Sequence, residues 1–179
     1  MRRIVFFSFV IIFVIISDQW SKAYIVENFK LYDPYPVIDG FLNFTFAKNT
    51  GAAFSFGGNF NSWVRLILFK ILPVAACFWL VKLLLDSVKT SLIMSWAYAL
   101  ILGGAIGNLI DRIRLDYVVD FIAVYSRKTS ILGLDIPSWH FAIFNIADSA
   151  ISIAAVFIII DFFKNKESNS KEKQKIKIS

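Results

Sequence analysis

The stretch LGGAIGNLIDRIRLDYVVDF, residues 102–121, decides the fold of this chain. It begins within a charge-free apolar run, residues 91–110, and ends in a dense group of polar side chains that includes Asp111, Arg112 and Asp120. Ionisable groups at the end of an apolar span are costly to keep near lipid, so they indicate a functional site. The rest of the chain can be interpreted as bringing a second carboxylate, Asp148, up to Asp120.

The composition indicates an integral membrane protein. Hydrophobic residues make up 58% of the 179 residues and charged residues only 18%, whereas a soluble domain carries about 25% charged residues. The net charge of +6 comes largely from a lysine-rich C-terminal end, which favours membrane topology over nucleic-acid binding. Because Cys77 is the single cysteine, an intramolecular disulfide is excluded.

Four apolar segments predict an all-α membrane protein with four transmembrane helices. We expect spans at about residues 4–24, 63–85, 91–113 and 139–161, each long enough to cross a bilayer. They form a single domain, residues 1–163, followed by a tail, residues 164–179, that we expect to be disordered. The first span looks like a signal peptide, but no small-residue cleavage site follows it at the right distance, so we interpret it as uncleaved.

The segments between the spans, residues 25–62 and 114–138, are too polar to cross a membrane. The first contains an alternation typical of a β-hairpin around a turn at 48–51, with apolar residues at Leu42, Phe44, Phe46, Ala52, Phe54 and Phe56. Aromatic side chains are stable at a membrane interface. We therefore predict a small β-hairpin or sheet that lies on the membrane surface.

Basic residues predict the orientation of the bundle. Arg2, Arg3, Lys89 and six lysines of the tail fall on one side of a four-span topology. The positive-inside rule assigns that side to the cytoplasm. Both termini are then cytoplasmic, and segments 25–62 and 114–138 are extracytoplasmic.

Two spacings indicate contacts within or between the spans. Asp18 and Lys22 are four residues apart and share a helix face, so they form either an interfacial ion pair or part of a functional site. Gly103 and Gly107 have the GxxxG spacing that permits close helix packing.

Polar side chains also gather on the third and fourth spans. On a continuing helix, Asn108, Asp111 and Arg112 can approach one face, with Gly104 one turn before Asn108. The fourth span carries one polar stripe on an otherwise apolar helix, made of Asn145, Asp148, Ser149 and Ser152.

The two carboxylates Asp120 and Asp148 can meet just below the outer membrane surface, because the third span runs outward and the fourth returns. Two carboxylates in near contact can share a proton and act as general acid and general base, as in aspartic peptidases. A cation or proton path and a structural ion pair with Arg112 or Arg114 remain open. A path predicts polar residues along whole helices, whereas here they cluster at the outer ends.

Five blocks of the sequence match a known family. They are DQWSK at 18–22, NTGAAF at 49–54, GGAIGNLIDR at 103–112, VVDF at 118–121 and FNIADS at 144–149. In these blocks, and across the chain up to the tail, the sequence resembles the bacterial lipoprotein signal peptidases, or signal peptidase II. One position departs from the family pattern, because Asp116 stands where glycine is common. This departure bears on the local backbone geometry and on the proton affinity of the pair Asp120 and Asp148.

The resemblance implies a membrane aspartyl endopeptidase, a hydrolase of the bacterial inner membrane, that cleaves diacylglyceryl-modified prolipoproteins just before the lipid-bearing cysteine. Asp120 and Asp148 would be the catalytic pair. The supporting and substrate-binding positions would be Asp18, Lys22, Asn49, Gly51, Gly104, Asn108, Asp111, Arg112, Asn145 and Ala147. The resemblance implies no metal and no cofactor, membrane lipids and prolipoproteins as partners, and we expect a monomer that does not bind nucleic acid.

Two hypotheses follow for the site. One aspartate deprotonates water while the other protonates the substrate carbonyl, with Asn108 and Asn145 orienting the carboxylates. The hairpin around Asn49 and Phe54, residues 39–58, acts either as a lid over the substrate or as a sheet that rests on the membrane without touching it.

Overall fold

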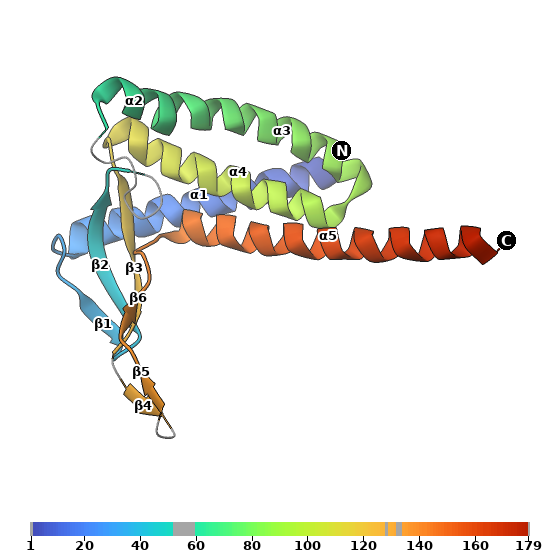
Figure 1. Cartoon of the computed structure of the whole chain (residues 1–179). Coiled ribbons are helices and arrows are strands. Elements are labelled where there is room, and N and C mark those ends of the chain that lie inside the picture. The colour runs from blue at the N-terminus through green and yellow to red at the C-terminus, as the bar shows by residue number, and fades with distance from the viewer. Residues whose placement is uncertain (1, 52–59, 128, 132–133, 179) are drawn as a thin grey trace.

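The computed structural model describes residues 2–51, 60–127, 129–131 and 134–178. Four long helices lie side by side, and a small sheet projects from one end of the bundle (Figure 1). We call this end the sheet end and the opposite end, where both chain termini lie, the tail end. Each of the four helical segments is long and apolar enough to cross a membrane, at Arg2–Asn28, Ser62–Thr90, Leu92–Arg114 and Ile146–Lys166. The predicted four-helix membrane fold is confirmed.

The helices are α1 (Arg2–Asn28), a second segment in three parts, α4 (Leu92–Arg114) and α5 (Ile146–Ile178). The second segment consists of α2 (Ser62–Leu66), the π-helical turn η2 (Ile67–Ile71) and α3 (Leu72–Thr90). Pro73, in the first turn of α3, has no N–H to donate to a carbonyl of the preceding turn. The wider π turn before it accommodates that missing hydrogen bond.

Helix α4 lies at the centre of the bundle and packs against α1, α3 and α5. Its packing face is made of small residues, including Ala97 and Ala99, which are fully buried. A Cβ atom on Gly103 would lie 2.9 Å from the Cβ of Val14 in α1, so this face permits the close approach expected from the GxxxG spacing. Lipid-facing surfaces instead carry large exposed apolar residues such as Phe13, which is 71% exposed.

A four-stranded antiparallel sheet of order β1-β2-β3-β6 stands at the sheet end. Its strands are β1 (Tyr35–Ile38), β2 (Leu42–Asn49), β3 (Val118–Ser126) and β6 (Trp139–His140). A separate hairpin of β4 (Thr129–Ile131) and β5 (Leu134–Ile136) extends beyond it (Figure 1). The register of β2 and β3 sets Ala47 opposite Asp120 and Asn49 opposite Val118, which brings Asn49 beside the Asp120 carboxylate.

The predicted strand from Leu42 to Phe46 is present as β2, but its described partners are β1 and β3. The expected second half of that hairpin, with Ala52, Phe54 and Phe56, lies outside the described residues.

Two boundaries in the last quarter of the chain differ from expectation. The fourth long helix begins at Ile146, not at Trp139, because Trp139 and His140 pair with β3. At its other end, α5 continues through the lysine-rich tail to Ile178, where we expected disorder. Lysine and glutamate are good helix formers, so the tail sequence is compatible with an extension of the helix.

Candidate active site

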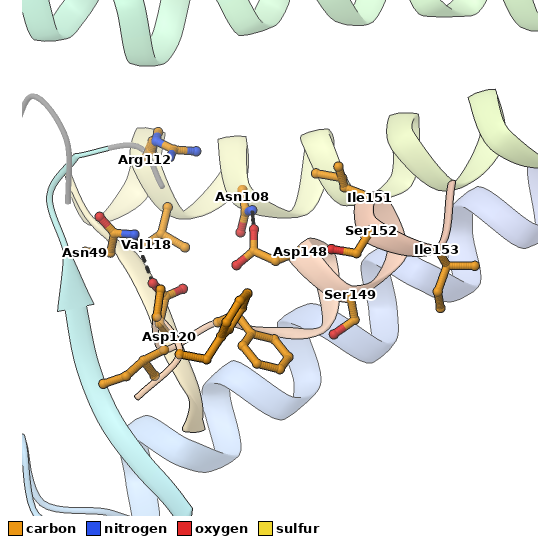
Figure 2. Close-up of a pocket in the computed structure, with 14 residues that line it drawn as sticks. Asn49, Asn108, Arg112, Val118, Asp120, Asp148, Ser149, Ile151, Ser152 and Ile153 are labelled. Carbon is orange, nitrogen blue, oxygen red and sulfur yellow. Dashed lines mark hydrogen bonds between the residues drawn. The ribbon is translucent and has the colours of Figure 1, made fainter. Parts of the chain in front are cut away.

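A cavity of about 550 Å³ opens at the sheet end, between α4, β3 and the start of α5. Asp120 and Asp148 both line it, and Figure 2 shows their side chains on facing walls. The rest of the wall is largely apolar and comes from Val118, the connector 141–144, Ile151 and Ile153. A mostly apolar cavity with a few converging polar groups is the usual form of a small-molecule or peptide site.

Asp120 is held by strand β3 and by two amide side chains. Its residue is 3% exposed. Oδ2 accepts a hydrogen bond from Asn49 Nδ2 at 2.9 Å, and Oδ1 accepts one from Asn145 Nδ2 at 2.8 Å. Because the two donors come from a neighbouring strand and from the residue before α5, the carboxylate is fixed by three elements of the fold.

Asp148 is positioned by the start of α5. The side chain of Asn145 accepts from the Asp148 backbone N–H at 2.9 Å, and Asp148 Oδ2 accepts from the Asn145 backbone N–H at 3.2 Å. These reciprocal bonds form a capping box, which satisfies two N–H groups at the helix N-terminus. The other oxygen, Oδ1, accepts from Asn108 Nδ2 at 2.8 Å (Figure 2).

Asn145 links the two carboxylates. It is fully buried, and its side chain contacts Asp120 through Nδ2 while its Oδ1 caps the turn that carries Asp148. Nδ2 also lies 3.1 Å from Asn108 Oδ1. A change at Asn145 therefore alters the orientation of both aspartates.

Beneath the cavity, Lys22 forms a buried polar cluster with Asp18, Asp111 and Asn108. Its ammonium Nζ lies 2.8 Å from Asp18 Oδ2, 3.0 Å from Asp111 Oδ2 and 2.9 Å from Asn108 Oδ1. A lysine has three N–H donors, so each one has a partner. Asp18 and Lys22, for which an interfacial ion pair and a part in a functional site were both open, are thus fully buried, and Lys22 orients the asparagine that holds Asp148.

The carboxylates of this cluster also accept hydrogen bonds from backbone N–H groups of neighbouring elements. Asp18 Oδ1 accepts from the Ala147 N–H at 2.9 Å, which ties α1 to the first turn of α5. Asp111 Oδ2 accepts from the Val119 N–H at 3.0 Å, which ties α4 to β3 next to Asp120. Each of the two aspartates in the cavity therefore has a backbone neighbour anchored by the Lys22 cluster.

Two glycines of α4 permit this arrangement. A Cβ on Gly104 would lie 2.5 Å from the carbonyl oxygen of Ala147, and a Cβ on Gly107 would lie 2.7 Å from Asp18 Oδ2. Neither distance is possible for a real side chain without movement of backbone or of the Asp18 carboxylate. Gly104 thus sets how closely α4, with Asn108, approaches α5, with Asp148.

Arg112 and Asn49 form the outer wall of the cavity. Arg112 Nη2 donates to the Gly51 carbonyl at 3.2 Å, and its guanidinium lies 5.7 Å from the centre of the Phe69 ring. Gly51 in turn donates its N–H to Asn49 Oδ1 at 3.1 Å. Neither Arg112 nor Arg114 forms an ion pair within 4 Å with Asp120 or Asp148 in the described part of the chain, so the structural ion-pair alternative has no support.

Burial raises the pKa of Asp120 to about 7. The hydrogen bond from Asn49 opposes this rise because it stabilises the carboxylate, whereas the negative charge of Asp148 adds to it. Near neutral pH, Asp120 can therefore hold a proton that it is able to give to a bound group.

All twelve residues that the sequence singled out lie in or around this cavity. Asn49, Asn108, Arg112, Asp120 and Asp148 line it. The others support those side chains through the contacts above. Sequence reasoning missed Gln19, whose Nε2 donates to Asp111 Oδ1 at 3.0 Å and to the Gly107 carbonyl at 3.1 Å; its position inside the DQWSK block was the available signal.

The polar stripe expected on the fourth span is only partly a helix face. Asn145 precedes α5 as its cap, while Ser149 and Ser152 line the cavity beyond Asp148. The apolar connector 141–144 was also missed as a wall of the site, because it was assigned to the membrane span. Within the described residues, no group of three or more His, Cys, Asp or Glu side chains is placed to hold a metal ion.

Asp116 stands apart from the cavity. Its φ is +64°, in the left-handed region that favours glycine and that aspartate also tolerates. Its exposed carboxylate pairs with Lys70 at 2.6 Å, and hydrogen bonding to this lysine lowers the pKa of Asp116. Asp116 thus accepts the glycine-type backbone without placing a third carboxylate beside Asp120.

Comparison with known proteins gives one consistent family. A profile of the signal peptidase (SPase) II family matches residues 10–164. The lipoprotein signal peptidase of Shewanella oneidensis is 39% identical over 168 residues, covering 94% of this chain and 92% of the relative. That of Acinetobacter baylyi is 42% identical over 160 residues, covering 87% of this chain and 81% of the relative.

A solved structure described as a bacterial membrane enzyme, determined by the in meso method, has a TM-score of 0.73 and 34% identity to this chain. The match covers 92% of each chain. This chain therefore belongs to the signal peptidase II family of aspartic peptidases.

Proposed function

We propose that this protein removes the signal peptide from prolipoproteins by means of a water molecule activated between Asp120 and Asp148. Membership of the signal peptidase II family supports the substrate class. The observation that carries the mechanism is that two carboxylates from distant parts of the chain line one cavity and are held by the same buried asparagine, Asn145. The bond cleaved is the one before the lipid-bearing cysteine of a diacylglyceryl-modified precursor.

The surroundings of the two carboxylates suggest how they divide the work. Asp120, with a pKa of about 7, holds the proton and gives it to the carbonyl oxygen of the scissile bond. Asp148, in its ionised form, takes a proton from water as the water oxygen bonds to the carbonyl carbon. The resulting diol collapses when Asp148 passes its proton to the leaving nitrogen, and Asp120 recovers a proton from the diol hydroxyl. Both carboxyl groups thus return to their starting states.

Asn49, Asn108 and Asn145 orient the carboxylates through their amide N–H groups. Because these donors are already bonded to the aspartates, the reaction needs little reorganisation of the site. The apolar wall formed by the connector 141–144 and Ile151 suits an apolar signal sequence or an acyl chain that enters from the membrane. Asn49 belongs to the hairpin for which a lid and a membrane-resting sheet were both open; it lies at the cavity wall, which favours contact with such a substrate.

The location of the cavity also fits a membrane substrate. It lies at the sheet end, where the spans stop. Exposed aromatic residues there, such as Tyr35 of β1 and Phe41 of the turn between β1 and β2, suit a membrane interface. We further propose that the enzyme acts as a monomer, with residues 1–163 as one domain in the bacterial inner membrane. Both termini are cytoplasmic and the cavity is near the extracytoplasmic surface.

A cation path is less compatible with the buried residues. The buried charged side chains within the described residues gather at the sheet end, while the core of the other half contains Phe7, Ala99 and Leu102. A path for ions needs polar groups along its whole length. Hydrolysis at one end of the bundle needs no such path.

The direct test is cleavage of a purified diacylglyceryl-modified prolipoprotein by the purified enzyme in detergent. We expect Asp120→Asn and Asp148→Asn to lower turnover by about 10⁴-fold or more, because the two groups act as a unit. Asp116→Asn is the matched control, since it neutralises an exposed carboxylate in the same region and should retain full activity. The unmodified precursor should be cut poorly or not at all.

Retention of normal turnover by either variant of the pair, with folding intact, would contradict the aspartate mechanism. Equal cleavage of the lipidated and the unmodified precursor would contradict lipid selectivity but leave the mechanism standing.

A further inference from the structure

A second cavity lies at the tail end of the bundle, between the start of α1 and the end of α3. Figure 1 shows these helix ends at the opposite end of the bundle from the sheet. The volume of the cavity is about 500 Å³. Residues from the start of α1 and the end of α3 line it, namely Arg2, Arg3, Ile4, Leu85, Val88 and Lys89. The cavity therefore combines three cationic side chains with an apolar floor.

None of these three cations has an anionic partner among the described residues. The ion pairs of the described chain involve Lys22, Lys70 and Arg127 only. Asp86 is the carboxylate nearest in sequence to Lys89, and it forms no ion pair with any residue that the structure describes. Asp161 of α5 accepts instead from the hydroxyl of Ser91 at 2.8 Å.

One of the cations also fixes the shape of the cavity. Arg3 Nη1 donates to the carbonyl oxygen of Val88 at 3.2 Å, which ties the first turn of α1 to the last turns of α3. Val88 is buried and forms the floor, whereas Leu85 and Ile4 are 44% and 40% exposed at the rim. The guanidinium of Arg3 has five N–H donors, so this one bond leaves donors for a ligand.

We propose that this cavity binds the anionic phosphate headgroup of a phospholipid. Arginine and lysine donate charge-assisted hydrogen bonds to phosphate oxygens, and basic pockets at the ends of membrane helices bind anionic headgroups. The acyl chains lie along the exposed apolar surfaces that continue from the rim. These include Phe6 of α1 and Phe78 and Val81 of α3, which are 50%, 75% and 41% exposed.

The positive charge at this end of the bundle has a simpler alternative explanation, because basic residues keep a loop on the cytoplasmic side of the membrane. That rule depends on the number of charges near the membrane. It requires neither a cavity between helices nor an apolar floor beneath the charges. A variant that fills the cavity but keeps every charge therefore separates the two explanations.

The test is the thermal unfolding temperature of the full-length purified protein in a mild detergent with added ligands. A ligand that binds the folded state raises this temperature. We expect phosphatidylglycerol to raise it by about 3 °C or more, and zwitterionic phosphatidylcholine and inorganic phosphate at the same concentration to leave it unchanged. An equal rise with inorganic phosphate would overturn the lipid as the source of the anion, and an equal rise with phosphatidylcholine would overturn recognition of negative charge.

Three variants localise the effect. Arg3→Gln and Lys89→Gln should each lose most of the rise produced by phosphatidylglycerol. Leu85→Trp keeps all three cations but fills the rim of the cavity, and it should lose the rise as well. Lys164→Gln is the matched control, because it removes one positive charge from α5 at the same end without lining the cavity, and it should respond as the wild type does.

Cleavage of a prolipoprotein by each variant serves as the check of folding, since none of these residues lies near the catalytic pair. A folded Leu85→Trp protein with the full rise, or a Lys164→Gln protein that loses it, would overturn the proposal.

Discussion

Lys22 and Lys70 each hold an aspartate at short distance, but in opposite surroundings. Lys22 Nζ is 2.8 Å from Asp18, and the two side chains are 3% and 0% exposed. Lys70 Nζ is 2.6 Å from Asp116, and those side chains are 30% and 78% exposed. The shorter pair is the one that water and salt can screen.

The comparison teaches that burial, rather than distance, decides what these contacts do. The buried cluster of Lys22 has no solvent to replace a lost partner, and it anchors the backbone at Ala147 and Val119. The exposed pair joins η2 to the loop before β3 and can exchange its partners for water. Removing a charge from each region should therefore give very different results.

The largest effect should come from Lys22→Met. It leaves two carboxylates buried without a cation, and breaking a buried ion cluster in this way costs about 3–5 kcal/mol. We expect a marked loss of folded protein and of thermal stability in detergent. The triple variant that also carries Asp18→Asn and Asp111→Asn should recover much of that stability, because no unpaired charge remains. Wild-type stability in Lys22→Met alone would contradict the importance that we assign to burial.

A smaller effect should come from Gly107→Ala, which places a methyl group against the carboxylate of Asp18. Overpacking of this kind costs about 1–3 kcal/mol. Gly103→Ala is the matched control, since its methyl group meets Val14 in α1 instead. Both should lower the unfolding temperature. Only Gly107→Ala should also lower kcat of the folded enzyme, because it displaces a partner of Lys22, and an equal kcat in the two variants would contradict this.

The pH dependence of cleavage tests the comparison between the buried and the exposed region through the protonation of Asp120. Activity should fall above about pH 7, as Asp120 loses the proton that it must donate. Asn49→Leu removes a hydrogen bond that lowers the pKa of Asp120, so the fall should move to higher pH. Asp116→Gly should leave the pH of this fall unchanged, because solvent screens the exposed pair Lys70–Asp116 from the cavity. Profiles of kcat/KM against pH for the two variants measure these effects. A shifted profile for Asp116→Gly would show that the exposed pair influences the protonation of Asp120.

The smallest effect is expected from Lys70→Met. Asp116 keeps its hydration when this partner is lost, so the unfolding temperature and kcat should both match those of the wild type within error. Raising the ionic strength should likewise leave both unchanged. A loss comparable to that of Lys22→Met would show that the exposed pair holds the site together.

Local patterns in the sequence were sufficient to predict the four helices and the residues that make up the site. Apolar runs predicted the four spans, and the spacing of Gly103 and Gly107 predicted close packing of α4. The convergence of Asp120 and Asp148 followed from the alternating direction of the spans. Each of these features depends on residues near one another in the chain or on the membrane as a common reference.

Long-range pairing could not be predicted in the same way. In the pairing of strand β2 with β3, Asn43 lies opposite Ala123, eighty residues later in the chain. Alternation alone does not identify the partner of a strand. The start of α5 at Ile146 was missed because Trp139 and Phe141 looked like part of the apolar run. Asn145 and Asp148 have the spacing of a capping box, which was the local signal that could have corrected it.

That capping box has a consequence for the dynamics of the enzyme. The bonds that begin α5 are also the bonds that aim Asp148, so the first turn of this helix cannot fray while the carboxylate stays in position. Helix ends in most proteins open readily, and the exchange of their amide hydrogens with solvent is fast. Here the backbone N–H of Asp148 donates a hydrogen bond to Asn145. The exchange rate of this amide hydrogen therefore reports how often the first turn of α5 opens and the Asp148 carboxylate loses its position.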